Sequence, residues 1–458
     1  MPPGLAMLAC IILILFFLKK DFAKDSKPSY TLLIPLVWFT IFASRTVDQW
    51  MDLGAEASLL NYEMGDANDR IIFSSLIILG LLALMRRGIS WSLLFKGNVW
   101  IFLWFLLCGV SILWSDFPGI AAKRWIKGVG TLIMAVIVIT EGEEGDGIGK
   151  IIRRCAYILL PLSVVFIKYF PELGGVGYDP WGNGPFFSGV TQTKNHLGRL
   201  CMISGLYFFW AGKKILQDSR GLAGKMAPIV ISIIACWLLF KANSKTAITG
   251  FFVGILVLFM LKRLQALKMH RMFGMCIGAA LMILLSLQFG LGINIFEDFT
   301  SALGRDKTLT GRTELWEDLW NMKTNPIIGV GYDSFWIGER VRTLWNKWWW
   351  RPNEAHNGYF EIYLELGIVG LLFFGMMLVA TYRKIIKTMD INFDQGKFKM
   401  VIFLVFILFN LTEASAKGVQ LVWTLFLFVS LEYPQRKIQT DRDDRHYHFG
   451  EKNPKVIT

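Results

Sequence analysis

Apolar residues along this chain come in long runs that are separated by short polar stretches, and they make up 54% of the sequence. A helix needs about 20 mostly apolar residues to cross the hydrocarbon core of a bilayer. The pattern therefore predicts an all-α, polytopic membrane protein with about 12–13 transmembrane helices. The predicted spans are 5–18, 30–44, 69–85, 98–114, 126–141, 152–170, 196–211, 227–243, 246–261, 273–292, 358–380, 400–414 and 418–432.

The domain organisation predicted from this pattern is one integral membrane domain, residues 1–433, because no segment repeats along the chain. Its largest loop covers about 293–356, and smaller loops cover about 114–126 and 171–195. A loop as long as the first is functional more often than it is a spacer. Residues 434–458 are charged and poor in apolar residues, which predicts a disordered tail.

The positive charge is concentrated in alternate loops. Pairs such as Lys19–Lys20 and Arg86–Arg87 lie in one set of loops, and the tail is also basic. By the positive-inside rule these loops and the tail are cytoplasmic, so the 293–356 loop and the two smaller loops face outward. An odd number of spans would place the N-terminus outside too. In this context the net charge of +13 does not indicate nucleic acid.

Lysines and arginines on the outer side are exceptions to this rule and require a reason. The candidates are Arg124, Lys194, Arg199, Lys245 and Arg312. A pyrophosphate fits, because an arginine fork binds its oxygens in pairs and a lysine acts as a point charge. In NSKTAIT and GRTELW, Lys245 and Arg312 stand at predicted helix starts, where backbone amides add donors for a phosphate. Snorkelling or loop solvation is the alternative for about half of the outward cations.

Two histidines are candidates for a general base. His356, in RPNEAHNGYFEIYLELGIVG, ends the large loop, and an unperturbed pKa near 6.5 would leave it neutral at physiological pH. The alternative is that His356 caps the helix that starts at Asn357, or binds interfacial water. His196 adjoins Lys194 and precedes Arg199, which favours a binding or structural role.

Charged residues within the predicted spans cluster near their outward ends, and Arg199, Glu361, Glu365 and Glu413 are examples. Because charge in the hydrocarbon is costly, these residues predict a polar cavity that opens outward. Glu365 and Glu413 are secondary site candidates, although solvation of a helix interface is the alternative for Glu365. The tryptophans 345 and 348–350 are expected to be interface anchors rather than sugar platforms.

The order of WSDFP, QTKNHLG, NSKTA, GRTELW with GVGYDSFW, AHNGYFEIYLELGIVGL and NLTEAS, from about Trp114 to Ser415, resembles the O-antigen ligase and Wzy-type polymerase superfamily. It is most similar to the exopolysaccharide production polymerases. The resemblance implies a GT-C-like glycosyltransferase that uses no cofactor and no metal ion. It also implies that His356 is the base and that Arg312 binds the pyrophosphate. Lys245 stands where ligases usually carry arginine.

The function implied by the resemblance is glycosyl transfer on the periplasmic side of the bacterial inner membrane. The donor would be a glycan linked to undecaprenyl pyrophosphate, and the product a polymer of exopolysaccharide or O-antigen repeat units. A ligase that transfers finished polymer to lipid A core is the alternative, and a transporter or flippase is a remote one. Membrane lipids, the glycan or lipid A acceptor, and chain-length regulator and export proteins are the expected partners.

Overall fold

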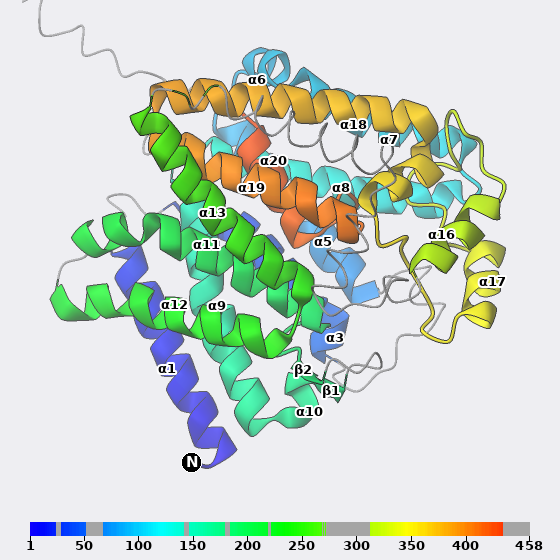
Figure 1. Cartoon of the computed structure of the whole chain (residues 1–458). Helices are drawn as coiled ribbons and strands as arrows, with labels where there is room; N and C mark the ends of the chain where they lie inside the picture. The colour runs from blue at the N-terminus through cyan, green and yellow to red at the C-terminus, as the bar shows by residue number, and fades with distance from the viewer. Residues whose placement is uncertain are drawn as a thin grey trace, which may run out of the picture.

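The computed structural model describes residues 1–23, 29–51, 67–141, 146–178, 184–218, 221–267, 269, 271 and 312–433. Within these ranges most residues are helical, which confirms the all-α prediction (Figure 1). One antiparallel hairpin joins β1 (Val176–Tyr178) and β2 (Pro185–Phe187) in the second outward loop. The span predicted at 273–292, loop residues 293–311 and the tail 434–458 lie outside the described residues.

The helices before the hairpin are α1 (Pro3–Phe22), η1 (Tyr30–Leu32), α2 (Leu33–Ala43), α3 (Val47–Met51), α5 (Ala67–Arg86), α6 (Trp91–Gly97), α7 (Val99–Val110), η2 (Ser111–Trp114), α8 (Pro118–Ile139), α9 (Gly147–Tyr169) and α10 (Pro171–Gly174). After the hairpin follow α11 (Lys194–Asp218), α12 (Gly221–Ala242), α13 (Lys245–Ala266), α16 (Arg312–Asn321), α17 (Glu339–Lys347), α18 (Gly358–Ile391), α19 (Phe393–Thr412) and α20 (Leu421–Ser430).

Five of the described helices are long and apolar enough to cross a membrane, namely α5, α12, α13, α18 and α19. A sixth candidate is formed by α6 with the following helix, and it is bent by 89° between them. The bend falls at Asn98, whose side-chain amide donates to the carbonyls of Leu94 and Glu432, each at 2.8 Å. The chain is therefore a multi-pass helical membrane protein, and the total of 12–13 spans stays a prediction.

Small residues bring α11 and α13 close together. A Cβ added to Gly198 would lie 2.8 Å from side-chain atoms of Ser244 and Ala247, and one added to Gly205 would lie 2.8 Å from Phe251. Helix pairs in membranes use such residues to approach closely. The same packing keeps the N-terminal ends of α11 and α13 side by side, which matters for the site below.

The large loop, predicted to face outward, is anchored to a break in α18. Gly367 has φ +63°, and its neighbour Ile368 donates to the carbonyl of Pro326 at 2.9 Å rather than within the helix. On the other side of the break, Gly331 donates to the carbonyl of Glu365 at 2.8 Å. The segment 326–331 therefore satisfies backbone groups that the break exposes, as a membrane helix requires. These contacts explain the glycine-rich NPIIGVG motif.

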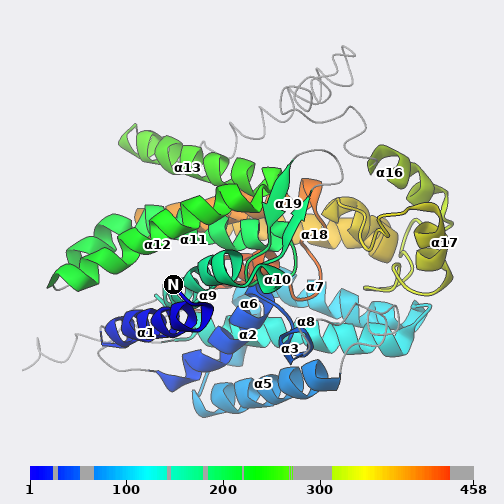
Figure 2. The ribbon, with the colours of Figure 1, turned by 90° about the horizontal axis from the view of Figure 1, so that it is seen from below.

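Helices α16 and α17 gather at the end of the bundle where α18 begins (Figures 1 and 2). They enclose a small apolar core of their own, which is composed of Leu315, Leu319, Val330, Phe335, Trp336, Leu344, Ala355 and Leu364. Trp345, Trp348 and Trp350 pack against this core, whereas Trp349 is 67% exposed. The three tryptophans thus pack within the loop, and their role as interface anchors stays a prediction.

Candidate active site

His356 lies in the turn that leads into α18. The helix is capped by Asn357, whose side-chain oxygen accepts from the amides of Tyr359 and Phe360 at 3.0 and 3.1 Å. Asparagine is a favoured N-cap because its oxygen satisfies amides that the first turn leaves unpaired. The cap is thus Asn357 and not His356, so the alternative that His356 merely caps this helix does not hold.

The backbone of this turn is fixed from both sides. The amide of Ala355 donates to Glu361 Oε2 at 2.8 Å, and its carbonyl accepts from Trp316 Nε1 at 2.7 Å. Glu361 also pairs with Lys417, from the segment that joins α19 to α20. His356 itself has φ +51°, a conformation that costs a non-glycine residue energy and persists only where neighbours impose it. The position of the imidazole is therefore specified.

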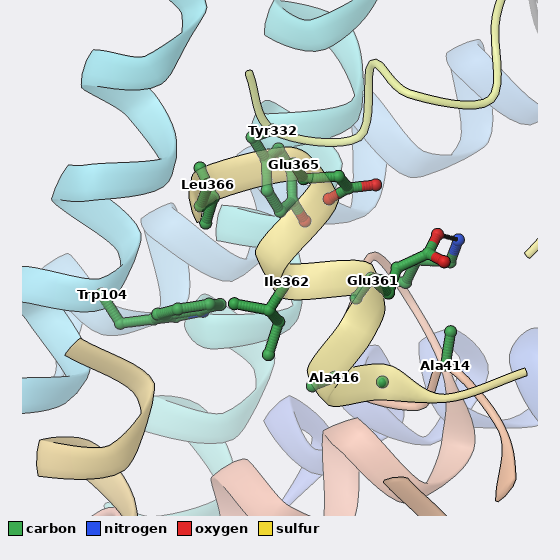
Figure 3. Close-up of a pocket in the computed structure, with 10 residues that line it drawn as sticks. Trp104, Tyr332, Glu361, Ile362, Glu365, Leu366, Ala414 and Ala416 are labelled. Carbon is green, nitrogen blue, oxygen red and sulfur yellow. Dashed lines mark hydrogen bonds and ion pairs between the residues drawn. The ribbon is translucent and has the colours of Figure 1, made fainter. Parts of the chain in front are cut away.

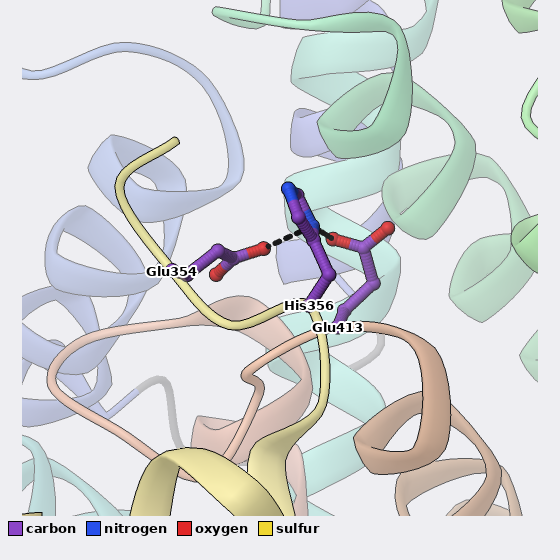
Figure 4. Close-up of side chains that lie close together, drawn as sticks. All are labelled: Glu354, His356 and Glu413. Atoms are coloured by element: carbon purple, nitrogen blue, oxygen red, sulfur yellow. Dashed lines mark ion pairs between the residues drawn. The ribbon is translucent and has the colours of Figure 1, made fainter. Parts of the chain in front are cut away.

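The imidazole of His356 faces two carboxylates through one ring nitrogen (Figure 4). Nδ1 lies 3.1 Å from Glu354 Oε1 and 3.7 Å from Glu413 Oε2. These contacts are ion pairs, since neither has the alignment of a hydrogen bond among the described residues. The other ring nitrogen points away from both carboxylates in Figure 4. A carboxylate at Nδ1 leaves Nε2 as the atom that exchanges a proton with a substrate, as in other histidine sites.

The protonation of His356 differs from the expectation. Burial lowers the pKa of the imidazole, but Glu354 and Glu413 favour the cation more strongly and raise the pKa to about 9. In the same pair, burial raises the pKa of Glu354, and the imidazolium outweighs this effect and holds that pKa well below its usual range. The expectation that His356 is mostly neutral at physiological pH is therefore wrong for this site. The imidazole is mostly cationic there.

Glu413 contacts cations from two further elements. Its Oε2 accepts from Arg199 Nη2 of α11 at 3.1 Å, and its Oε1 lies 3.7 Å from Arg312 Nη2 of α16. Arg312 also donates to the carbonyl of Thr412 at 2.7 Å, where the end of α19 carries partial negative charge. We call the group formed by Arg199, Arg312, Glu354, His356 and Glu413 the Glu413 cluster.

Helix N-termini converge on this cluster. The amide group of Asn195, at the start of α11, donates to Glu413 Oε1 at 3.3 Å. The hydroxyl of Ser244, directly before α13, donates to Asn195 Oδ1 at 3.0 Å. Arg312 begins α16, and His356 lies two residues before the start of α18. The N-terminal ends of helices carry partial positive charge and favour anions. The cluster therefore combines cationic side chains with several helix termini.

The other predicted cations lie around this cluster in different ways. Lys245 is exposed and follows Ser244 at the start of α13. Lys194 lies with its Nζ 4.9 Å from the ring centre of Phe186 in the hairpin. Arg124 belongs to a neighbouring group, because it donates to the carbonyl of Asp333 at 2.8 Å and pairs with its carboxylate at 3.1 Å.

His196 has a local role in the structure. Its Nδ1 lies 2.8 Å from the hydroxyl oxygen of Thr193, and its backbone amide donates to the same oxygen at 3.3 Å. Thr193 thereby acts as a cap of α11 in the manner of an N-terminal threonine. This arrangement favours the structural role over that of a base, as the sequence suggested.

Glu365 lies in a small cavity beside the cluster (Figure 3). Its Oε2 accepts from the amide of Asp333 at 3.0 Å, whereas its Oε1 has no partner among the described residues. The cavity has room for about one water molecule, which could satisfy that oxygen. Glu361 and Lys417 line the same cavity. Burial lowers the pKa of Lys417, but Glu361 and then Glu365 raise it well above its ordinary value.

Two members of this environment escaped the sequence analysis, Glu354 and Lys417. Glu354 is two residues from His356, but only the turn at φ +51° brings its carboxylate to Nδ1. Glu354 directly precedes the AHN motif, but a glutamate in a loop belongs to no periodic pattern that would identify it as a site residue. Lys417 is 61 residues further along the chain than His356, and no local pattern connects them.

The ligand atoms of Glu354, His356 and Glu413 lie within 4.8 Å of one another, a spacing that could hold a metal ion. Arg199 and Arg312 contact the same Glu413 carboxylate, so a divalent cation would meet two guanidinium groups there. The charge distribution thus favours an anion at this position. A reaction without a metal ion stays a prediction.

Comparisons with known proteins agree with the motifs. Residues 201–375 match the O-antigen ligase family. This range includes most of α11 and the His356 turn. The exopolysaccharide production protein ExoQ of Rhizobium meliloti (strain 1021) is 24% identical over 321 residues, which cover 68% of this chain and 70% of that protein. Both comparisons point to polysaccharide polymerisation or ligation, a glycosyltransferase-type activity. They confirm the resemblance seen in the sequence: this chain is similar to the O-antigen ligases and to an exopolysaccharide production protein.

Proposed function

We propose that this protein polymerises exopolysaccharide or O-antigen repeat units on the periplasmic side of the inner membrane, from a glycan linked to undecaprenyl pyrophosphate. The observation that carries the proposal is the Glu413 cluster, in which two arginines and an imidazole converge at helix N-termini. Such an arrangement suits a doubly phosphorylated leaving group. The likeness to the exopolysaccharide production protein of Rhizobium meliloti supports the choice of product.

In the proposed reaction the lipid tail of the donor lies in the outer leaflet, and Arg199 and Arg312 bind its pyrophosphate. Lys245, Lys194 and Arg124 supply charge around them. An acceptor hydroxyl oxygen attacks the anomeric carbon while the bond from that carbon to the pyrophosphate oxygen breaks. The lipid pyrophosphate leaves with the electron pair of this bond, and the guanidinium groups stabilise the charge that develops.

His356 takes the proton of the acceptor hydroxyl at Nε2, while Glu354 and Glu413 stabilise the resulting imidazolium at Nδ1. With a pKa of about 9, roughly one imidazole in a hundred is neutral at pH 7. That minority form is a correspondingly stronger base, which offsets part of its scarcity. The two carboxylates thus lower the fraction of His356 that is neutral and make its Nε2 more basic.

The test is a reaction of purified protein with a defined undecaprenyl-pyrophosphate-linked repeat unit, scored for chain extension. His356→Ala should reduce the rate by roughly two to four orders of magnitude, the usual contribution of a general base. His196→Ala is the matched control, since its imidazole contacts Thr193, and it should retain most of the activity. Full-length polymer made by His356→Ala protein at normal abundance would show that the base lies elsewhere.

A ligase that transfers polymer to lipid A core is the second candidate, favoured by the family that residues 201–375 match. The donor chemistry is the same, so glycolipids after gene deletion decide between the two. Loss of a polymerase leaves single lipid-linked repeats, whereas loss of a ligase leaves full-length lipid-linked polymer. Transport is disfavoured because the two halves of the sequence do not repeat and because segment 326–331 fills the break in α18.

A further inference from the structure

Glu413 differs from the other carboxylates near His356 in the number of cationic groups that it contacts. It is 3% exposed, and its oxygens meet Arg199 at 3.1 Å, Arg312 at 3.7 Å and His356 at 3.7 Å. A buried carboxylate among three cations is strongly held. The Glu413 carboxylate is thus an anion at the point toward which Arg199, Arg312 and His356 are directed.

We propose that Glu413 is a positioning residue whose carboxylate stands, in the donor-free site, where an oxygen of the donor pyrophosphate would bind, and directs Arg199, Arg312 and His356 toward that point. This inference rests on the proposed function, because it assigns the pyrophosphate to the same arginines. The donor then competes with Glu413 for the guanidinium groups. Arg199 remains available for a second ligand, since its Nε has no partner among the described residues.

The physical reason for such a residue is the mutual repulsion of the cations. Two guanidinium groups and an imidazolium within a few ångströms of a common point repel one another when no anion is present. A covalently attached carboxylate removes this cost before the donor arrives and keeps the side chains in their binding geometry. The cost is weaker binding of the free anion, because the carboxylate must give up part of its contacts.

The charged groups around His356 come from several elements. Glu354 is in its own turn, and Glu413 lies at the end of α19. Behind them are Arg199 of α11 and Lys417, both of which act on the charge of Glu354. Arg312 of α16 completes the set through Glu413. His196, on α11, also interacts electrostatically with Glu354.

Glu354 provides a matched control for Glu413. Both carboxylates lie within 4 Å of His356 Nδ1, but among the described ion pairs only Glu413 contacts Arg199 and Arg312. Glu354→Gln should therefore remove a direct contact of the imidazole only, whereas Glu413→Gln should remove contacts of the imidazole and of both arginines. Glu413→Asp keeps the negative charge, but its shorter side chain places the carboxylate further from the cations by the length of one methylene group.

The first experiment measures binding of inorganic pyrophosphate to the purified full-length variants by calorimetry. Glu413→Gln should bind pyrophosphate about tenfold more tightly than the wild type, because a competing charge is removed. Glu354→Gln and Glu413→Asp should stay within about threefold of the wild type. Equal affinity of the wild type and Glu413→Gln overturns the proposal, as does weaker binding by a Glu413→Gln protein with unchanged thermal stability.

The second experiment follows kcat/KM against pH with the lipid-linked donor. In Glu413→Gln the rising limb should move to lower pH by at least about one unit, and Glu413→Asp should restore most of its position. If the Asp and Gln variants change together, the residue acts through packing and the proposal is wrong. The variants could bind pyrophosphate with the expected order of affinities while the wild-type protein transfers no glycan. That result would contradict the proposed function and would leave the placement of Glu413 intact.

Discussion

Two buried ionic clusters in this protein have opposite character. In the first, Asp21 at the end of α1 bridges Arg153 and Arg154 of α9, with Arg154 Nε 2.8 Å from the carboxylate. Arg153 also donates to the Tyr207 hydroxyl at 3.0 Å and lies 3.6 Å from Asp146. This Asp21 cluster, composed of Asp21, Asp146, Arg153, Arg154 and Tyr207, has two cations and two carboxylates.

The Glu413 cluster has three cations and two carboxylates when His356 is protonated. Exposure does not separate the two clusters: the Arg312 and His356 side chains are 13% and 21% exposed and that of Asp146 is 45% exposed, whereas those of Asp21 and Arg154 are each 1% exposed. Two buried nitrogens of the Glu413 cluster, in Arg199 and His356, lack hydrogen-bond partners within the described chain. The balanced cluster joins helices, and the cation-rich one is suited to receive an anion.

The largest expected effect comes from unbalancing the Asp21 cluster. Asp21→Asn removes the charge that both arginines share, and removal of one partner of a buried pair costs about 3–5 kcal/mol. Denaturation of the purified protein in detergent should show this loss of stability, with activity per folded molecule unchanged. Glu413→Gln is the matched substitution; it should lose less stability, because His356 can release its proton, and its main effect should be on activity. Equal loss of stability in both variants would remove the distinction between the clusters.

A smaller effect is expected from Arg312→Ala. A charge-assisted hydrogen bond contributes about 1.5–3 kcal/mol, so kcat/KM for the lipid-linked donor should fall roughly ten- to hundredfold. Stability should change less than in Asp21→Asn, because the Arg312 side chain is partly exposed and lies 3.7 Å from the carboxylate of Glu413. Arg340→Ala is the control from the same loop, where Arg340 pairs with the half-exposed Asp116 at 2.7 Å. Similar kinetics for both arginine variants would argue against donor binding by Arg312.

An effect of similar size, without any substitution, is expected from pH. Because the pKa of His356 is raised to about 9, the rate should rise about tenfold per unit from pH 7 and level off near 9. The sign is opposite for stability. A raised pKa stabilises the fold fully below about 6.5, and this contribution is lost as the pH rises through about 9. A rate that is flat between pH 7 and 8.5 would contradict a base with this pKa.

The helical membrane fold could be predicted because each span is marked by its own residues. An apolar run is a local signal, and so is the sign of charge in the loop that follows it. The break at Gly367 was not predicted, because its cause is the segment 326–331, which lies about 40 residues earlier in the chain. The core against which Trp345, Trp348 and Trp350 pack was not predicted for the same reason, since it is formed by contacts between separate segments.

Sequence by itself determined that His356 stands near the start of a helix, that Arg312 and Lys245 begin others, and that charge collects near the ends of predicted spans. Only the tertiary structure decided which of these groups meet. Glu413 was one secondary candidate among several until α11, α16 and the His356 turn placed Arg199, Arg312 and His356 around it. The protonation of His356 follows from that assembly, because a pKa depends on the charges that surround a group in space and not on its neighbours in sequence.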